Sequence, residues 1–206
     1  MKQKLSWLIS FLICMFLLSK PLSAQLVSMN ELVQLVYNIV RNNKIVGSVN
    51  VSSQLKENQL IIRTETFFII RMVANFEAKA VTTNTFNGNT LMHATVLRTL
   101  NGNVKTDNEI QFKAGRYQVG KGKSKQPINH AIMHTVCGLF LNEPVNISEV
   151  FSEVYLQYVQ IRKVAPGVYE TLLPDGGLMT YMYQSGVLTK VVAKTNYATF
   201  QYQLRK

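Results

Sequence analysis

The sequence predicts a mainly β protein, an antiparallel meander of about ten strands that curls into a partial barrel or splits into two packed layers. Apolar and polar residues alternate in short runs over most of the chain, which is the pattern of half-buried strands. Turn pairs such as Asn87-Gly88, Asn101-Gly102 and Pro166-Gly167 separate these runs. One stretch near residues 128–141 has helical spacing instead, so we expect one central helix between two groups of strands.

Residues 1–24 have the three-part pattern of an export signal: basic Lys2 and Lys4, an apolar run, and a small-residue site that ends at Ala24. The apolar run Leu5–Leu18 is shorter than the roughly 20 residues that cross a bilayer as a helix. We therefore expect a cleaved signal peptide at 1–24 and a single β-rich domain at 25–206. The domain is expected to be periplasmic or associated with the outer membrane, and to contain no transmembrane segment.

Residues 26–41 fit the spacing of a helix and of a strand. The turn Asn42-Asn43 favours the strand, because asparagines tolerate the positive φ of a hairpin turn, and a short helix before Gln34 remains an alternative. Further strands are expected at 45–54, 59–68, 72–86, 90–100, 104–112 and 117–120. In the run 59–68, alternate residues from Leu60 to Phe68 form the expected inward face.

A basic segment without acids ends this first group of strands, and it contains Lys113, Arg116, Lys121, Lys123 and Lys125. One interpretation is an anion-binding rim at the edge of a sheet. The other is a solvated loop whose lysines keep an edge strand from aggregating, which is the commoner use of such charges.

The expected helix carries apolar residues at three- and four-residue spacing, namely Ile132, Met133, Val136, Leu139 and Phe140. A connector at 148–151 follows it. Strands at 153–163, 168–173, 179–183, 187–194 and 198–204 then close the chain. No linker or repeat divides the mature chain, so we expect one domain.

The only metal-like pattern is His130, His134 and Cys137, which a helix would stack along one side. The pattern lacks the glutamate base of the metalloprotease helix, and packing of these residues at the core boundary is the favoured alternative. Loss of Cys14 with the signal peptide leaves Cys137 without a disulfide partner. With no nucleophile elbow, phosphate loop or paired carboxylates, we expect neither an enzyme nor a cofactor. A metal-dependent enzyme remains the distant alternative.

Aromatic residues on the expected strands are the better functional signal. A curled sheet would direct many of them at its concave side, where they would bind an apolar ligand. The candidate ligand-binding residues are Phe67, Phe68, Phe76, Tyr155, Tyr181 and Tyr183. An ordinary packed β core is the alternative, because aromatics are good strand formers.

The chain has 22 basic and 11 acidic residues, and loss of three lysines with the signal peptide leaves 19 − 11, a net charge of +8. For an exported basic protein we expect anionic partners such as lipid headgroups rather than nucleic acid. The predicted function is therefore binding of an apolar or amphiphilic molecule of the cell envelope, with contact to a membrane surface. The alternative is a structural or protein-interaction module of the envelope with a dry core.

Three segments carry a resemblance to a known family: VYNIVRNNKIVGSVNV with Tyr37 and Gly47 around a hairpin, LFLNEP, and LPDGGLMTYMYQSGVLTKVV. They resemble an uncharacterised family of exported β-proteins, a domain of unknown function best represented in Bacteroidetes. Such families are similar in outline to periplasmic half-barrel proteins, including the lipoprotein carriers. The resemblance implies a half-open barrel around a helix and an apolar cavity, and it supplies no catalytic residue.

Overall fold

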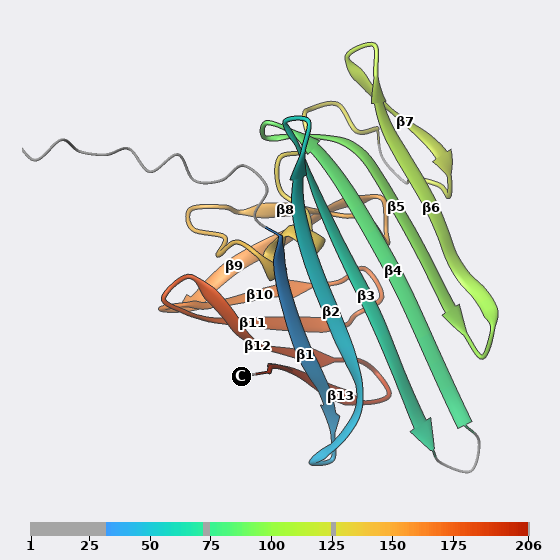
Figure 1. Cartoon of the computed structure of the whole chain (residues 1–206), viewed down its shortest axis with the longest axis vertical. Coiled ribbons are helices and arrows are strands. Elements are labelled where there is room, and N and C mark those ends of the chain that lie inside the picture. Colours follow the sequence, from blue (N-terminus) through green and yellow to red (C-terminus); the bar gives the residue numbers. More distant parts are fainter. Residues whose placement is uncertain (1–31, 72–74, 125–126, 206) are drawn as a thin grey trace, which may run out of the picture.

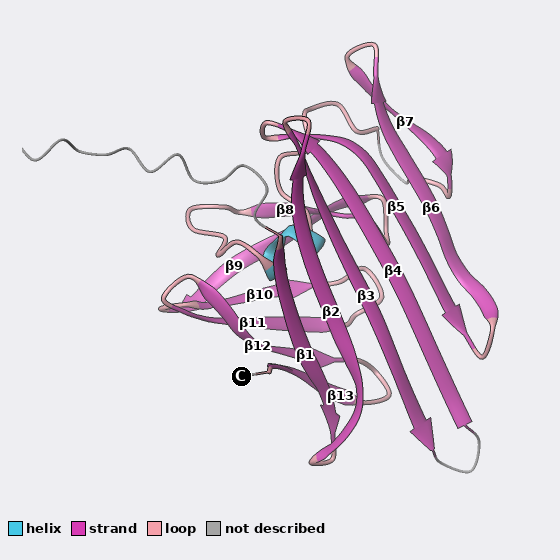
Figure 2. Ribbon diagram, in the orientation of Figure 1, coloured by secondary structure: helices cyan, strands magenta, loops and turns pink. Residues whose placement is uncertain are grey.

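A computed structural model describes residues 32–71, 75–124 and 127–205. These residues form one antiparallel sheet of thirteen strands, in the order β7-β6-β5-β4-β3-β2-β1-β13-β12-β11-β10-β9-β8. The sheet does not close on itself, and Figures 1 and 2 show that it is folded into two layers. The predicted antiparallel β fold is confirmed, with three more strands than the expected ten.

The first layer consists of β1 (Val33–Arg41), β2 (Lys44–Lys56), β3 (Gln59–Arg71), β4 (Asn75–Asn87), β5 (Thr90–Leu100), β6 (Asn103–Lys113) and β7 (Arg116–Lys121). The second layer consists of β8 (Glu149–Ser152), β9 (Gln157–Ala165), β10 (Val168–Leu172), β11 (Leu178–Gln184), β12 (Val187–Lys194) and β13 (Thr199–Leu204). No helix in the described part of the chain is long and apolar enough to cross a membrane.

The two layers meet along one seam, where β1 pairs with β13. The long strands of the first layer cross the shorter strands of the second layer steeply (Figure 1), as in an orthogonal packing of sheets. The space between the layers holds two apolar clusters. One lies at the seam around Tyr37, Ile39 and Tyr181, and the other lies around Phe86, Leu91 and Phe151.

Turns with positive φ connect the strands as the sequence predicts. Asn42 and Asn43 have φ of 49° and 59°, and Gly88 and Gly102 have φ of 55° and 75°. The inward face expected from Leu60 onward is confirmed, because Ile62 is buried between the layers. Residues 26–31 of the first expected strand, and the predicted signal peptide, lie outside the described residues.

The predicted central helix at 128–141 is wrong. This stretch belongs to a connector, residues 122–148, in which the described residues form only one 3₁₀ turn, η1 (Cys137–Phe140). Hydrogen bonds to strands use the backbone groups that a helix would need: Leu91 N donates to Ile132 O at 2.8 Å, and Phe151 N donates to His134 O at 2.8 Å. The apolar residues of this stretch instead pack into both clusters: Ile132 belongs to the cluster around Phe86, and Leu139 belongs to the cluster at the seam.

Two further boundaries differ from the prediction. Strand β8 takes up most of the expected connector at 148–151 and ends one residue beyond it, and the expected strand at 153–163 begins only at Gln157. Residues 153–156 form a turn in which Leu156 has a φ of 51°. Tyr155 therefore lies on a turn of the second layer, not on a strand.

The sheet has two edges, β7 and β8. The connector covers part of β8 through a parallel bridge between Thr135 and Phe151. Within the described residues β7 pairs with β6 alone, and it lies inside the basic segment. The expectation that these charges accompany an edge strand is confirmed, although Lys125 lies outside the described residues.

Candidate functional site

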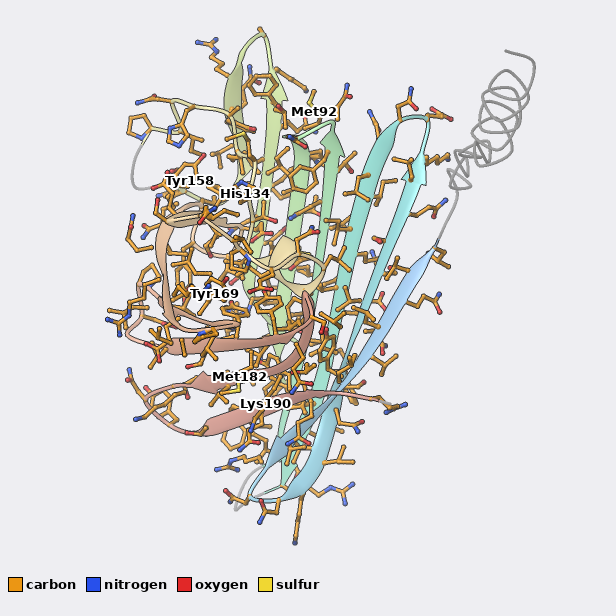
Figure 3. The ribbon with its side chains drawn as sticks, turned by 90° about the vertical axis from the view of Figure 1, so that its left-hand side faces the viewer. Met92, His134, Tyr158, Tyr169, Met182 and Lys190 are labelled. Carbon is orange, nitrogen blue, oxygen red and sulfur yellow. The ribbon has the colours of Figure 1, made fainter. Side chains whose placement is uncertain are left out.

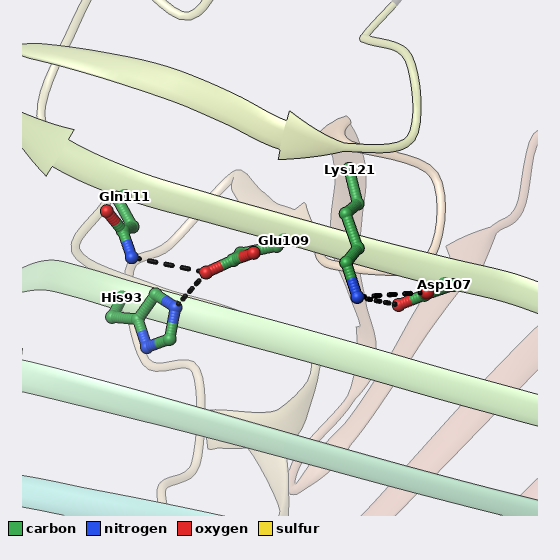
Figure 4. A network of polar contacts seen from close by, with 5 residues as sticks. All are labelled: His93, Asp107, Glu109, Gln111 and Lys121. Carbon is green, nitrogen blue, oxygen red and sulfur yellow. Dashed lines mark hydrogen bonds and ion pairs between the residues drawn. The ribbon is translucent and has the colours of Figure 1, made fainter.

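The two faces of the first layer differ in chemistry. The outer face carries ion pairs, including Arg63–Glu65 at 2.6 Å and Lys79–Glu77 at 2.7 Å. On β5, β6 and β7, a network on this face joins His93, Glu109 and Gln111, with Lys121 bound to Asp107 nearby (Figure 4). Surface pairs of this kind contribute little to stability, and they keep the outer face solvated.

The inner face of β3, β4 and β5 is divided into bands by the strand register. Residues paired across an antiparallel sheet point to the same face, so each row of partners can be followed from the seam. One row runs through Tyr37, Val49, Thr66, Ala80 and Arg98. Because Tyr37 is fully buried between the layers, Arg98 also lies on the inner face.

We call the middle of this inner face, together with its continuation on β6, the polar band, which contains Thr64, Thr66, Thr82, Asn84, Arg98, Thr106 and Asn108. We call its far end the apolar end, which contains Phe68, Ile70, Phe76, Ala78 and Leu100. Figure 1 shows that β3 and β4 extend past the strands of the second layer at this end. Phe68 still contacts Phe200 of β13, with ring centroids 5.3 Å apart, whereas Phe76 is 37% exposed.

A buried carboxyl group lies where the polar band meets the second layer. Glu153 is 3% exposed and accepts hydrogen bonds from Asn84 Nδ2 at 2.6 Å and from the backbone N–H of Cys137 at 3.1 Å. Burial raises the pKa of the Glu153 carboxyl, and these hydrogen bonds oppose the rise only in part. Burial, and then the charge of Glu153, raises the pKa of the Cys137 thiol well above its usual value. The thiol is therefore an unreactive group of the core.

A hollow of about 320 Å³ lies between the connector and the β4–β5 end of the first layer. Its walls are mostly apolar and include Leu60, Ile62, Phe86, Leu139 and Ile147. At its rim Glu143 accepts a hydrogen bond from Tyr169 at 2.8 Å. Its size is at the lower end of the range for small-molecule sites.

The six predicted ligand-binding aromatics do not form one site. Tyr181 and Tyr183 are buried in the seam cluster, and the Tyr183 hydroxyl donates to Leu139 O at 2.6 Å. Phe67 lies on the outer face beneath Lys79. Phe68 and Phe76 share the inner face of the first layer. Tyr155 lies on a turn of the second layer, where its hydroxyl donates a hydrogen bond to Asp175.

The three candidate metal ligands do not converge either. His130 stacks on Tyr158 at 4.5 Å and pairs with Glu149, His134 borders the hollow, and Cys137 is buried. Figure 3 shows His134 and Tyr158 above Tyr169, at the upper end of the second layer. No group of three or more potential metal ligands is found among the described residues.

Sequence reasoning missed Arg98 and Glu153. For Arg98 a signal exists: between Ala94 and Leu100 the alternate residues Ala94, Val96 and Leu100 are apolar, and Arg98 shares their face. A charge on the inward face of a strand is unusual. Glu153 gives no such signal, because it lies on a turn whose burial depends on contacts with β4 and the connector.

Together these features define an all-β protein built on one open antiparallel sheet, with a barrel-like outline and an interior that is polar in the middle and apolar toward one end. The chain belongs to DUF6134, a family described as a domain of unknown function, whose model matches residues 37–205. The family of unknown function that the sequence resembles is thereby confirmed, whereas export and bacterial origin stay predictions.

Among solved structures the chain is similar to a beta-barrel-like protein of the domain of unknown function DUF1849 from Brucella abortus. The match has a TM-score of 0.50 and 9% sequence identity, and it covers 86% of this chain and 97% of that one. At this identity the likeness shows the fold alone. No curated protein matches the chain.

Proposed function

We propose that this protein is a non-catalytic binding protein that holds an apolar or amphiphilic molecule of the cell envelope between its two layers. The observation that carries the proposal is the apolar end, an inward-facing apolar surface that the second layer leaves partly exposed. We also propose that the protein is located in the periplasm or at the outer membrane, which rests on the predicted signal peptide. Its proposed contact with membrane lipids rests on the net positive charge.

The apolar end differs from ordinary exposed hydrophobic residues by its position. Single exposed apolar side chains are common on protein surfaces and need no explanation. Here Phe76, Ile70 and Leu100 lie together on the face that elsewhere forms the core, while the opposite face carries the ion pairs. Small-molecule sites are mostly apolar surfaces with a few polar groups beside them, and the apolar end adjoins the polar band.

The test is binding of an apolar fluorescent probe, 1,6-diphenylhexatriene, to the mature protein. We expect Phe76→Ser to weaken binding about tenfold, the loss expected for removing a large apolar contact of ~1.5 kcal/mol. Phe67→Ser is the matched control, because Phe67 is 40% exposed and Phe76 37%, on opposite faces. Equal effects of the two substitutions would contradict the location, and no probe binding at all would contradict the function.

A structural or protein-interaction role is the second candidate, favoured by the tight packing of Tyr181 and Tyr183 in the seam cluster. Native mass spectrometry of the protein purified from its own envelope separates the two candidates. A lipid-sized excess mass that is lost on denaturation supports the binding role. A bare chain mass, with no uptake of added amphiphile, supports the interaction role.

A further inference from the structure

Building on the proposed function, we propose that the ligand is a single-chain amphiphile with a carboxylate head group. Its head group binds at Arg98 and the tyrosine hydroxyls of the second layer, and its chain lies on the apolar end.

The first argument is the place of Arg98. Among the described residues it is the single charged side chain on the inner face of β3, β4 and β5, whose rows run from Leu60 to Leu100. None of the ion pairs formed by the described residues includes Arg98. A guanidinium group binds a carboxylate through two parallel hydrogen bonds, which makes this the natural anionic ligand for it.

The second argument is what faces Arg98 from the other layer. Tyr202 of β13 lies in the row of strand partners that contains Ile39 and Phe68, and this row is next to the row of Arg98. Burial raises the pKa of Tyr202, and the positive charge of Arg98 opposes that rise. Arg98 also acts on Tyr155 and Asp175, which are joined by a hydrogen bond from the Tyr155 hydroxyl to Asp175 Oδ2. Arg98 is exposed to solvent, so its guanidinium group is accessible to a ligand that binds on the inner face.

The charge of Asp175 also selects among anions. The positive charge of Arg98 is partly offset by the negative charge of Asp175, so the net electrostatic potential at the site is only weakly positive. A dianionic phosphate would be repelled by Asp175 more strongly than a monoanionic carboxylate. This favours a carboxylate head group over a phosphate.

The third argument is a pair of buried hydroxyl groups that no protein atom satisfies. The Tyr181 hydroxyl and Thr171 Oγ1 have no hydrogen-bond partner within the described protein, and both residues are 0% exposed. Buried hydroxyl groups are normally bonded to protein, water or ligand. Tyr181 lies in the same row of strand partners as Tyr202, with Val191 of β12 between them. Burial holds the pKa of Tyr181 above its usual value, so its hydroxyl is a donor for a carboxylate oxygen.

The fourth argument is the length of the apolar surface. The row of Phe68, Ala78 and Leu100 adjoins the row of Arg98, and the row of Ile70 and Phe76 follows it. At about 3.4 Å per residue, the four steps along β3 from Thr66 to Ile70 span about 14 Å. An extended chain of about ten to twelve carbon atoms fits this distance, and the alanine side chains leave room for it.

The hollow beneath the connector is the less suitable place for this head group. Glu143 contributes a carboxylate to its rim, and a second carboxylate would be repelled there. None of the lysine or arginine side chains of the described residues lines it.

The experiment compares three probes by isothermal titration calorimetry at neutral pH, below micelle-forming concentrations. Dodecanoate has the proposed head group and chain, dodecyltrimethylammonium has the same chain with the opposite charge, and acetate has the head group alone. We expect dodecanoate to bind at least tenfold more tightly than dodecyltrimethylammonium, and acetate to show no measurable binding.

Variants then locate the head group. Arg98→Gln should weaken dodecanoate binding about tenfold to a hundredfold, the loss of a charge-assisted hydrogen-bonded pair, and should leave dodecyltrimethylammonium unchanged. Arg63→Gln is the matched control, because it removes an arginine from the outer face of β3, and it should change neither affinity. Tyr181→Phe should weaken dodecanoate binding by a smaller factor without lowering the urea midpoint of the free protein.

Failure of this inference differs from failure of the proposed function. Equal binding of the two dodecyl compounds, or dodecanoate binding that survives Arg98→Gln, overturns the carboxylate site and leaves an apolar binding protein. Absence of binding by both dodecyl compounds overturns the proposed function as well. Where Arg98→Gln fails to fold, the comparison of probes on the unmodified protein and on Tyr202→Phe decides the matter.

Discussion

Glu153 shows how a single ionisable residue couples the two layers to pH. Its carboxyl group is held by a first-layer side chain, Asn84, and by the connector at Cys137 N. Asn108 adds a hydrogen bond to the carbonyl of Glu153 at 2.9 Å. The charged form of the carboxyl is disfavoured in this buried position, which is why its pKa is raised. The neutral form is thus the one that the folded protein prefers.

The pH dependence of stability follows from that preference. The unfolded chain releases this proton near pH 4.3, whereas the folded protein holds it to higher pH. Between the pKa of Glu153 in the unfolded chain and its higher pKa in the folded protein, the folded state binds more protons than the unfolded state. The free energy of unfolding therefore falls as pH rises through this interval, and the contribution of Glu153 to stability is lost completely above the folded pKa. We expect Glu153→Gln, which keeps the acceptor oxygen, to abolish this part of the decline.

The measurement is the urea midpoint of the wild-type protein and the variant from about pH 4 to pH 8. The urea midpoint of Glu153→Gln should rise relative to that of the wild type as pH rises. Glu65→Gln removes an exposed outer-face carboxylate and serves as the control for the lost negative charge. Parallel profiles for wild type and Glu153→Gln would show that the carboxyl does not titrate in the core.

At the scale of elements, the connector fills space between the two layers as an irregular segment and does not form a helix. Its backbone bonds to β5 and β8, and its apolar side chains enter both clusters. The two neighbours Ile132 and Met133 show the contrast, because Ile132 is 0% exposed and Met133 is 54% exposed. Helical spacing would have placed both on the same broad apolar face.

We expect Ile132→Ala to lower the free energy of unfolding by about 2–4 kcal/mol, the usual cost of a cavity left by a large core side chain. Met133→Ala should cost less than about 0.5 kcal/mol, as for most exposed positions. Urea unfolding followed by circular dichroism measures both. Similar losses for the two variants would indicate that this stretch packs one continuous face, as a helix does.

The elements differ in how far the sequence determines them. The turn at Asn42-Asn43 and the alternation from Leu60 were predictable, because turn chemistry and strand period are local. The connector was not, because its hydrogen-bond partners Leu91 and Phe151 are distant in sequence. For the candidate site, the strand pattern identified Phe68 and Phe76. It could not separate them from the core residues Tyr181 and Tyr183, because that difference depends on which strands extend beyond the second layer.

At the scale of the whole molecule, one seam joins the two layers of the sheet. Its register pairs Tyr37 with Leu204 and Val40 with Gln201. The buried Tyr37 hydroxyl adds a hydrogen bond to Leu188 O of β12 at 3.0 Å. Without β13, both β1 and β12 would have unpaired edges beside the largest apolar cluster.

We therefore expect deletion of residues 199–206 to abolish the cooperative thermal transition and to cause aggregation, because exposed apolar strand edges associate. Arg205→Ala is the control, since it removes only the exposed contact of Arg205 with the Asn38 side chain and should cost less than about 1 kcal/mol. Differential scanning calorimetry and light scattering measure the two effects. A truncated protein that melts cooperatively would show that each layer is stable alone.

The seam also determines when the protein can fold during its synthesis. The contact between Arg205 and Asn38 spans 167 positions of the chain. Strand β1 therefore leaves the ribosome early and cannot pair with β13 until β13 has been translated. Contacts of such long range are formed late and slowly. Until then β1 presents an unpaired edge of the kind that chaperones shield in nascent chains. A ribosome stalled before residue 199 should thus hold a long chain with its first strand still open to capture.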